Sequence, residues 1–217
     1  MSTPTIEQYL LSTCLFIIDK FNEMYKGLDK SQLKIIADNE YNELDICSRI
    51  ATPFGDMVHY STRDSKKKAD YDLYVKSKHF KIRVKYPKNF KSKNGTNSCS
   101  VNWDVYQNNF NWLENEIKSN KGKCAFIIGW FNCVEKFSQI IQLGFGKGSK
   151  PIVDEHRLVY FPFLRKLKNP TTIKDLDYDY DIAYKSEKLK NIGVKKSNID
   201  CMFLGNENDK FHFAIYF

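Results

Sequence analysis

The chain has 217 residues, of which 42% are hydrophobic and 15% aromatic, so it can bury the core of one domain. Its apolar run over residues 10–18 is too short to span a bilayer and lacks a basic leader, so we expect neither a membrane helix nor a signal peptide. Six scattered cysteines, with no C-x-x-C pair among them, are typical of reduced core residues. We therefore expect a cytoplasmic protein with no membrane partner.

The net charge of +8 comes from one stretch of the chain. Residues 63–93 hold twelve Lys or Arg against three Asp, whereas the remainder holds 22 basic and 23 acidic residues. A concentrated positive charge favours a polyanionic partner. The alternative is a solvated basic surface that serves solubility.

Two helical patterns open the chain. The first begins near Pro4 and ends before Gly27. Asp29 can cap a second helix, which we expect to run to about Ile50. Glu40 falls within the apolar stripe of this second helix, where an unpaired carboxylate would be costly.

A β-hairpin is predicted next, with strands over residues 71–75 and 80–85. In the second strand, apolar residues alternate with Lys81, Arg83 and Lys85, so its polar face carries three cations in a row. Such a row repels itself unless an anion lies over it. The pattern therefore raises the question of which anion that is.

Two pairing registers place acidic residues beside these cations. A two-residue turn at residues 77–78 sets Asp72 opposite Arg83 and Asp70 opposite Lys85. A slip by two residues sets Asp72 opposite Lys85 instead. Both registers keep the four charged residues on one face, because side-chain parity is preserved. The simplest interpretation is a pair of exposed ion pairs of little energetic value.

A polar loop, a helix and a strand follow the hairpin. The loop covers residues 88–100. The helix is expected from about Asp104, which is its candidate cap, with Tyr106, Phe110, Leu113 and Ile117 as its apolar stripe. Residues 124–131 form a continuous apolar run, which is typical of a strand covered on both faces. No linker or repeat interrupts the sequence, so we expect a single domain over residues 1–217.

This order of elements resembles that of the PD-(D/E)XK nuclease superfamily. In that superfamily a helix precedes a strand bearing an Asp, and a second strand bearing acid-x-Lys is followed by a helix and an apolar strand. The matching stretches are ADYDLYV with Asp72, KIRVKY with Lys85, YQNNFNWLENEI and AFIIGWF, within about residues 30–132. The resemblance implies an α/β restriction-endonuclease-like core with a mixed central sheet flanked by helices, and a C-terminal elaboration over about residues 133–217.

The resemblance also implies a metal-dependent endonuclease that cleaves phosphodiester bonds. Carboxylates of such an enzyme hold Mg²⁺ or Mn²⁺, which polarises the phosphodiester and activates water. Asp72 would be a metal ligand, and Lys85 would place a cation beside the attacking water. Here, however, the acid of acid-x-Lys is replaced by Arg83, which cannot bind a metal ion but binds phosphate well.

Three explanations of Arg83 stay open. In the first, the acid has migrated to Glu114 on the later helix, or to Glu40, which resembles a helix-borne metal ligand; the alternative for Glu40 is a buried structural ion pair. In the second, the site is inactive, no metal is needed, and the scaffold binds nucleic acid or acts as an immunity-like or inhibitory partner of another protein. The third is a laboratory change at position 83.

We expect nucleic acid, above all double-stranded DNA, to be the partner. The cations expected to contact it are Arg63, Lys66, Lys67, Lys68, Lys81, Arg83, Lys88, Lys91 and Lys93. Binding through phosphates weakens steeply with salt, whereas apolar docking of a protein partner is far less sensitive.

Overall fold

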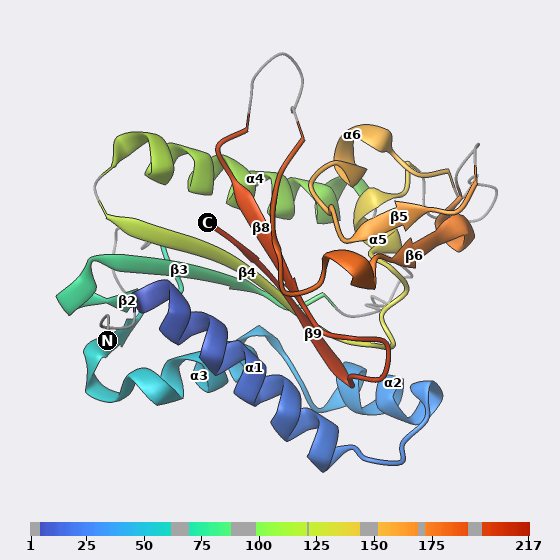
Figure 1. Cartoon of the computed structure of the whole chain (residues 1–217), viewed down its shortest axis with the longest axis horizontal. Coiled ribbons are helices and arrows are strands. Elements are labelled where there is room, and N and C mark those ends of the chain that lie inside the picture. Colours follow the sequence, from blue (N-terminus) through green and yellow to red (C-terminus); the bar gives the residue numbers. More distant parts are fainter. Residues whose placement is uncertain are drawn as a thin grey trace.

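A seven-stranded mixed sheet packed against helices forms the centre of the protein, so the expected α/β class is confirmed (Figure 1). The structure is a computed structural model that describes residues 5–61, 70–87, 99–120, 122–143, 152–168, 172–190 and 197–217. Within these residues, no helix is both long and apolar enough to cross a membrane.

Two antiparallel groups of strands meet at one parallel pair in this sheet. Across the sheet, the strands are β1 (Val58–Tyr60), β2 (Leu73–Val75), β3 (Phe80–Lys85), β4 (Lys123–Phe131), β9 (Phe211–Tyr216), β8 (Asp200–Leu204) and β7 (Ser186–Lys188). Neighbouring strands are antiparallel except for β3 and β4. A separate two-stranded sheet consists of β5 (Leu164–Lys166) and β6 (Leu176–Tyr178).

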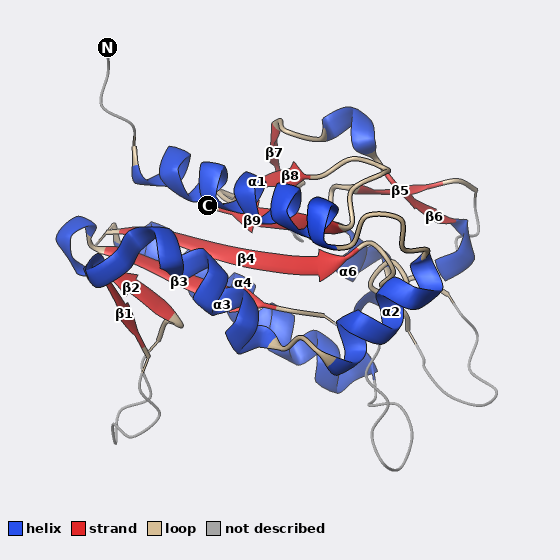
Figure 2. Cartoon of the chain, turned by 90° about the horizontal axis from the view of Figure 1, so that it is seen from below, coloured by secondary structure: helices blue, strands red, loops and turns tan. Residues whose placement is uncertain are grey.

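Helices cover both faces of the large sheet. They are α1 (Ile6–Met24), α2 (Lys30–Asn39), α3 (Glu43–Ala51), α4 (Cys99–Ser119), α5 (Ser138–Ile141) and α6 (Glu155–Leu158). The described chain also contains the 3-10 segments η1 (Thr52–Met57), η2 (Lys76–Lys78), η3 (Ile173–Asp175) and η4 (Tyr180–Ile182). In Figure 2, α1 and α3 lie in front of the sheet and α4 lies behind it. The sheet therefore has one apolar cluster on each face.

The expected single helix from Asp29 to about Ile50 is wrong, because the chain turns between α2 and α3. Asp29 caps α2 as expected, whereas Asn42 accepts backbone N–H groups of α3 and Asp45 reaches back to the backbone of Asn42. These contacts satisfy the N–H groups exposed at a helix start, so α3 begins as a separate helix. Glu40 is the exposed residue that ends α2 and is not part of a buried stripe.

Three other sequence patterns are confirmed. β3 alternates as predicted, since Phe80, Ile82 and Val84 are fully buried and the residues between them are only half-buried. Every residue of β4 after its first is buried, as expected for a strand covered on both faces. α4 buries its predicted apolar stripe, but it starts before Asp104, so this residue is not the helix cap.

The C-terminal part of the chain completes the same sheet. β9 pairs with β4 in antiparallel orientation, and all six residues of β9 are buried. Phe211 and Phe213 belong to the apolar cluster beneath α1, whereas Tyr216 belongs to the cluster beneath α4. Residues 133–217 thus supply a strand that joins the two apolar clusters.

His212 of β9 is a fully buried titratable group. Its Nε2 lies 2.9 Å from the carbonyl oxygen of Asn206, and its ring contacts the rings of Trp130 and Phe203 edge-on. Burial lowers the pKa of His212 to about 4, against opposing effects of the Asn206 carbonyl and the Asp209 charge. The folded protein therefore holds this imidazole neutral at pH 7.

The stability of the protein should decrease on acidification because of His212. Between the ordinary pKa of 6.5 and the folded-state pKa of about 4, the unfolded chain binds a proton that the folded chain does not. We expect the free energy of unfolding to fall by about 3 kcal/mol from this residue as the pH drops from 7 to 4. Urea titrations over this pH range measure the effect. His212→Gln should lose that part of the pH dependence, and an unchanged profile would contradict the assignment.

Candidate functional site

Asp72 lies at the end of the sheet where β3 finishes and β2 begins. Strand pairing sets Leu73 opposite Ile82, which is the first of the two expected registers. One residue earlier, Asp72 donates its N–H to the Ile82 carbonyl at 2.9 Å, and its Oδ2 accepts the N–H of Val84 at 2.8 Å. Asp72 is therefore hydrogen-bonded to both residues that flank Arg83, Ile82 and Val84.

The hairpin connection is longer than the expected two-residue turn. Val75 pairs with Phe80, so residues 76–79 join the strands through the 3-10 segment η2 and a left-handed His79 with φ of 48°. The loop is longer than the expected one by one residue at each end, so the register of the two strands stays the same. The register is therefore the expected one, but β2 begins only at Leu73, so Asp70 and Asp72 precede the paired residues, and Asp70 forms its ion pair with Lys81 instead of Lys85.

Arg83 is fixed between the hairpin and α4. Its Nε donates to the carbonyl of Asp70 at 2.9 Å, and its Nη1 donates to Oδ1 of Asn109 at 3.2 Å. The guanidinium also lies 4.5 Å above the ring of Trp112. Burial lowers the pKa of Arg83 from its ordinary value, and the carboxylates of Asp72 and Asp70 act in the opposite direction. The arginine thus connects two elements of the fold.

The two lysines that flank Arg83 on β3 are also paired within the chain. Lys81 lies 2.8 Å from Asp70 and 3.1 Å from Glu116 of α4. Lys85 lies 2.6 Å from Glu43, the first residue of α3. The anions that face the cationic row are therefore carboxylates of the protein itself.

Glu43, Asp72 and Lys85 form one charged group at the end of β3. All three charges act on the thiol of Cys47, which lies on α3. The pKa of this thiol is raised to about 12, first by burial and then by the two carboxylates, while the lysine acts in the opposite direction. The Glu43–Lys85 ion pair brings a helix-borne carboxylate to the end of β3, where Asp72 bonds to the neighbouring Val84.

The two glutamates expected as migrated acids lie elsewhere. Glu40 is exposed at the end of α2, and Glu114 forms an ion pair with Lys118 at 2.9 Å along α4. The helix-borne carboxylates that contact β3 are Glu43 and Glu116. Glu40 ends α2 whereas Glu43 begins α3, and Glu114 and Glu116 both lie on α4.

The residues at this site do not fit the metal centre of the nuclease motif. Arg83 stands where a third oxygen ligand is needed and remains cationic, so it opposes a divalent cation beside Asp72. One oxygen of Glu43 is held by Lys85, and one oxygen of Asp72 is held by the backbone of Val84. In the part of the chain that the structure describes, no three His, Cys, Asp or Glu side chains are grouped closely enough to hold a metal ion.

Most of the cations expected to contact nucleic acid lie outside the described residues. They are Arg63, Lys66, Lys67, Lys68, Lys88, Lys91 and Lys93. The described residues next to them are close to the site: Ser61 donates its N–H to the Asp72 carbonyl at 3.0 Å, and Pro87 follows Lys85 by two residues. Both basic segments therefore join the described chain beside Asp72 and Lys85.

No protein-family model, curated protein or solved structure matches this chain.

Replacing Arg83 should destabilise the fold. Arg83→Met keeps an unbranched stem but removes two hydrogen bonds and the contact with Trp112. We expect the free energy of unfolding to fall by about 2–3 kcal/mol, because charge-assisted bonds at a half-buried site are lost. Chemical denaturation measures this change.

The matched control is Lys118→Met, which breaks the exposed Lys118–Glu114 pair on α4. It should cost about 0.5 kcal/mol or less. A double-mutant cycle between Arg83→Met and Asn109→Ala should show coupling, since the two side chains share a bond. If Arg83→Met lowers the free energy of unfolding no more than the control does, the stabilising role of the Arg83 contacts is contradicted.

Proposed function

We propose that this protein is a nucleic-acid-binding protein with a PD-(D/E)XK-type core, whose site has lost the metal ligands for cleavage. The observation that carries the proposal is the grouping of Asp72, Lys85 and Glu43 at the sheet end where both basic segments attach. Duplex DNA is the proposed partner, since a regular row of phosphates matches a concentrated positive charge.

The order and direction of the elements support the nuclease-type core. α3 is followed by the antiparallel strands β1, β2 and β3, and α4 then leads to β4, which pairs parallel with β3. A helix, the hairpin strands β2 and β3, a further helix and an apolar strand are the order expected from the sequence resemblance; β1 and the parallel pairing of β3 with β4 are not part of that expectation. Asp72 and Lys85 lie in this frame at the positions of the motif Asp and Lys.

The charge balance of β3 indicates which cations are available for phosphate. Lys81 and Lys85 form ion pairs with carboxylates of the protein, so they contribute little net charge to an external ligand, and the guanidinium of Arg83 is held by Asp70 and Asn109. The surplus of basic residues then lies in the neighbouring segments 62–69 and 88–98. We therefore assign DNA contact to Arg63, Lys66, Lys67, Lys68, Lys88, Lys91 and Lys93.

Charge reversal in these segments should weaken DNA binding. We expect the quadruple variant Lys66→Glu, Lys67→Glu, Lys91→Glu and Lys93→Glu to lose retention of a duplex at moderate salt. The slope of log K against log salt should become shallower by roughly one unit for each phosphate contact removed. Fluorescence anisotropy with a labelled duplex at several salt concentrations measures both effects.

The matched control reverses four lysines elsewhere: Lys20, Lys26, Lys34 and Lys118, which lie on α1, the turn after it, α2 and α4. It changes the net charge by the same amount, so it should retain most of the binding and most of the salt slope. Equal losses of duplex binding in both variants would mean that only the net charge matters, and this would overturn the assignment. Duplex binding by the parent that does not depend on salt would also overturn it and favour the protein-binding alternative.

Cleavage tests separate an inactive site from a migrated acid. We expect the parent to leave a supercoiled plasmid intact in Mg²⁺ or Mn²⁺. Arg83→Glu removes the opposing cation and adds an oxygen ligand, so calorimetry should show tighter Mn²⁺ binding. Adding Asp72→Ala should abolish that gain.

A parent protein that nicks the plasmid would contradict the loss of cleavage. Single replacements would then locate the acid, because Glu43→Ala should stop cleavage if the glutamate beside Lys85 has taken over. Glu40→Ala and Glu114→Ala test the two positions expected from the sequence. In that outcome Arg83→Glu should change the rate only modestly.

A further inference from the structure

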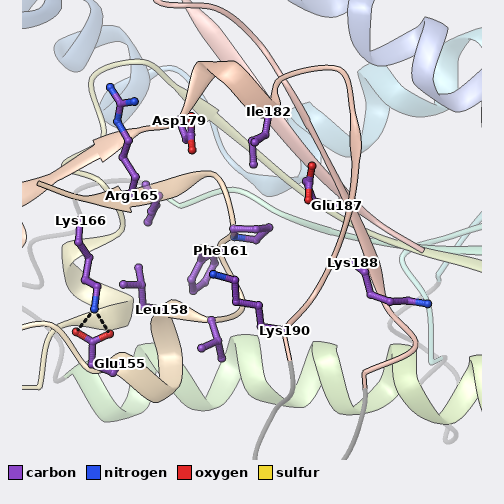
Figure 3. Close-up of a pocket in the computed structure, with 13 residues that line it drawn as sticks. Glu155, Leu158, Phe161, Arg165, Lys166, Asp179, Ile182, Glu187, Lys188 and Lys190 are labelled. Atoms are coloured by element: carbon purple, nitrogen blue, oxygen red, sulfur yellow. Dashed lines mark hydrogen bonds and ion pairs between the residues drawn. The ribbon is translucent and has the colours of Figure 1, made fainter.

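A cavity of about 520 Å³ lies in the C-terminal part of the chain, between α6, β5, η4 and β7 (Figure 3). β7 is the edge strand opposite β1, so β4, β9 and β8 separate the cavity from the charged group on β3. The cavity is therefore a second candidate site, independent of the proposed DNA contact. Its volume falls in the range of pockets that hold small molecules.

The wall of the cavity is apolar. Leu158, Phe161 and Leu164 are buried residues that line it, and Pro162 and Ile182 add half-buried apolar surface. Such a wall favours a flat or apolar ligand body, because contact with the wall removes both surfaces from water.

The rim of the cavity carries charged residues of both signs. Lys166 turns towards Glu155 and lies 2.9 and 3.1 Å from its two carboxylate oxygens, so these two charges cancel (Figure 3). Lys190 is exposed and points into the cavity (Figure 3). Arg165 also lines the cavity, but its guanidinium lies 4.0 Å from the carboxylate of Asp181, and the side chain of Lys188 points away from the cavity (Figure 3). Two further carboxylates line the cavity. An anionic group in the ligand would meet Lys190 first.

The two remaining carboxylates, of Asp179 and Glu187, limit the kind of anion. An ionised carboxylate only accepts hydrogen bonds, so it repels a simple fatty acid or a ligand that is anionic throughout. A ligand that also carries hydroxyl or amino groups can donate to it, as ribose hydroxyls do to acidic residues in dinucleotide sites. The rim therefore fits a ligand with a phosphate at one end and donors near its centre.

We propose that this cavity binds a nucleoside 5'-phosphate, with its base against the apolar wall and its phosphate at Lys190. The planar base matches the apolar wall, and the two ribose hydroxyls can donate to the carboxylates. The terminal phosphate matches the lysine. The same chemistry occurs in a free nucleotide and at the phosphorylated 5' end of an oligonucleotide, and the experiment distinguishes the two.

Isothermal titration calorimetry of the full chain with AMP, GMP, CMP and UMP tests the proposal. At least one nucleotide should bind, and the matching nucleoside and inorganic phosphate alone should each bind about tenfold more weakly, because each lacks part of the contact. Competition by a 5'-phosphorylated trinucleotide would assign the cavity to a chain end. Binding of the free nucleotide without such competition would assign it to a free ligand.

The test variant is Lys190→Glu, and Lys20→Glu on the exposed face of α1 is its matched control. Lys190→Glu should weaken nucleotide binding about tenfold or more through loss of a charge-assisted bond, while the control stays unchanged. Both positions are exposed, so both variants should fold. Leu158→Trp, which fills the cavity, should also block binding.

No binding of any of the four nucleotides at millimolar concentration would overturn the proposal. Equal affinity of the parent and Lys190→Glu would overturn it as well. Duplex binding by Lys190→Glu should equal that of the parent, since Lys190 is not among the residues assigned to DNA contact. The proposed nucleotide site and the proposed DNA contact can thus fail separately.

Discussion

The contacts between the cations on β3 and nearby carboxylates are the constraint on which the packing of α3 and α4 against this strand depends. Three like charges on one strand face oppose folding unless carboxylates approach them closely. Glu43 of α3, Glu116 of α4 and Asp70 before β2 supply those carboxylates, and each comes from a different element. The ion pairs therefore fix how α3 and α4 sit against the strand. A half-buried ion pair contributes modestly to stability, but removing one partner leaves a poorly solvated charge, so the arrangement favours one packing over its alternatives.

Arg83 shows why the same contacts that stabilise the fold reduce its capacity for metal chemistry. Its planar group can donate to Asp70 and Asn109 in one direction while its face stacks on Trp112. A carboxylate at this position could not make these contacts, and its charge would face Asp72 without a cation between them. The network is thus self-consistent with arginine, and it places a positive charge at the position where the acid-x-Lys motif that the sequence resembles has an acid.

The sequence predicted the elements whose signal is local and missed those set by distant contacts. The alternation of β3, the apolar run of β4 and the stripe of α4 each follow from burial of neighbouring residues. The break between α2 and α3 was missed, although Asn42 followed by Asp45 is a capping pattern that would have placed Glu43 at a helix start. Glu114 and Glu116 are two residues apart, so their side chains point about 200° from each other around the helix. The packing angle of α4 decides which of them faces β3, and no local sequence pattern specifies that angle. The pairing of β9 with β4 joins segments far apart in the chain, and no local pattern specifies it.

The position of β9 explains how one sheet can carry two separate polar sites. β4 and β9 are buried on both faces, so the centre of the sheet has no room for solvated charge. Charged groups that take part in binding must then lie at the edges, one where β3 meets the short strand β2 and the other beyond the edge strand β7. The aromatic residues around Trp130 keep this centre dry, which is also why His212 stays neutral there. The addition of β9, β8 and β7 beside β4 therefore gives the sheet a second edge, next to which the cavity lies, without disturbing the charges on β3.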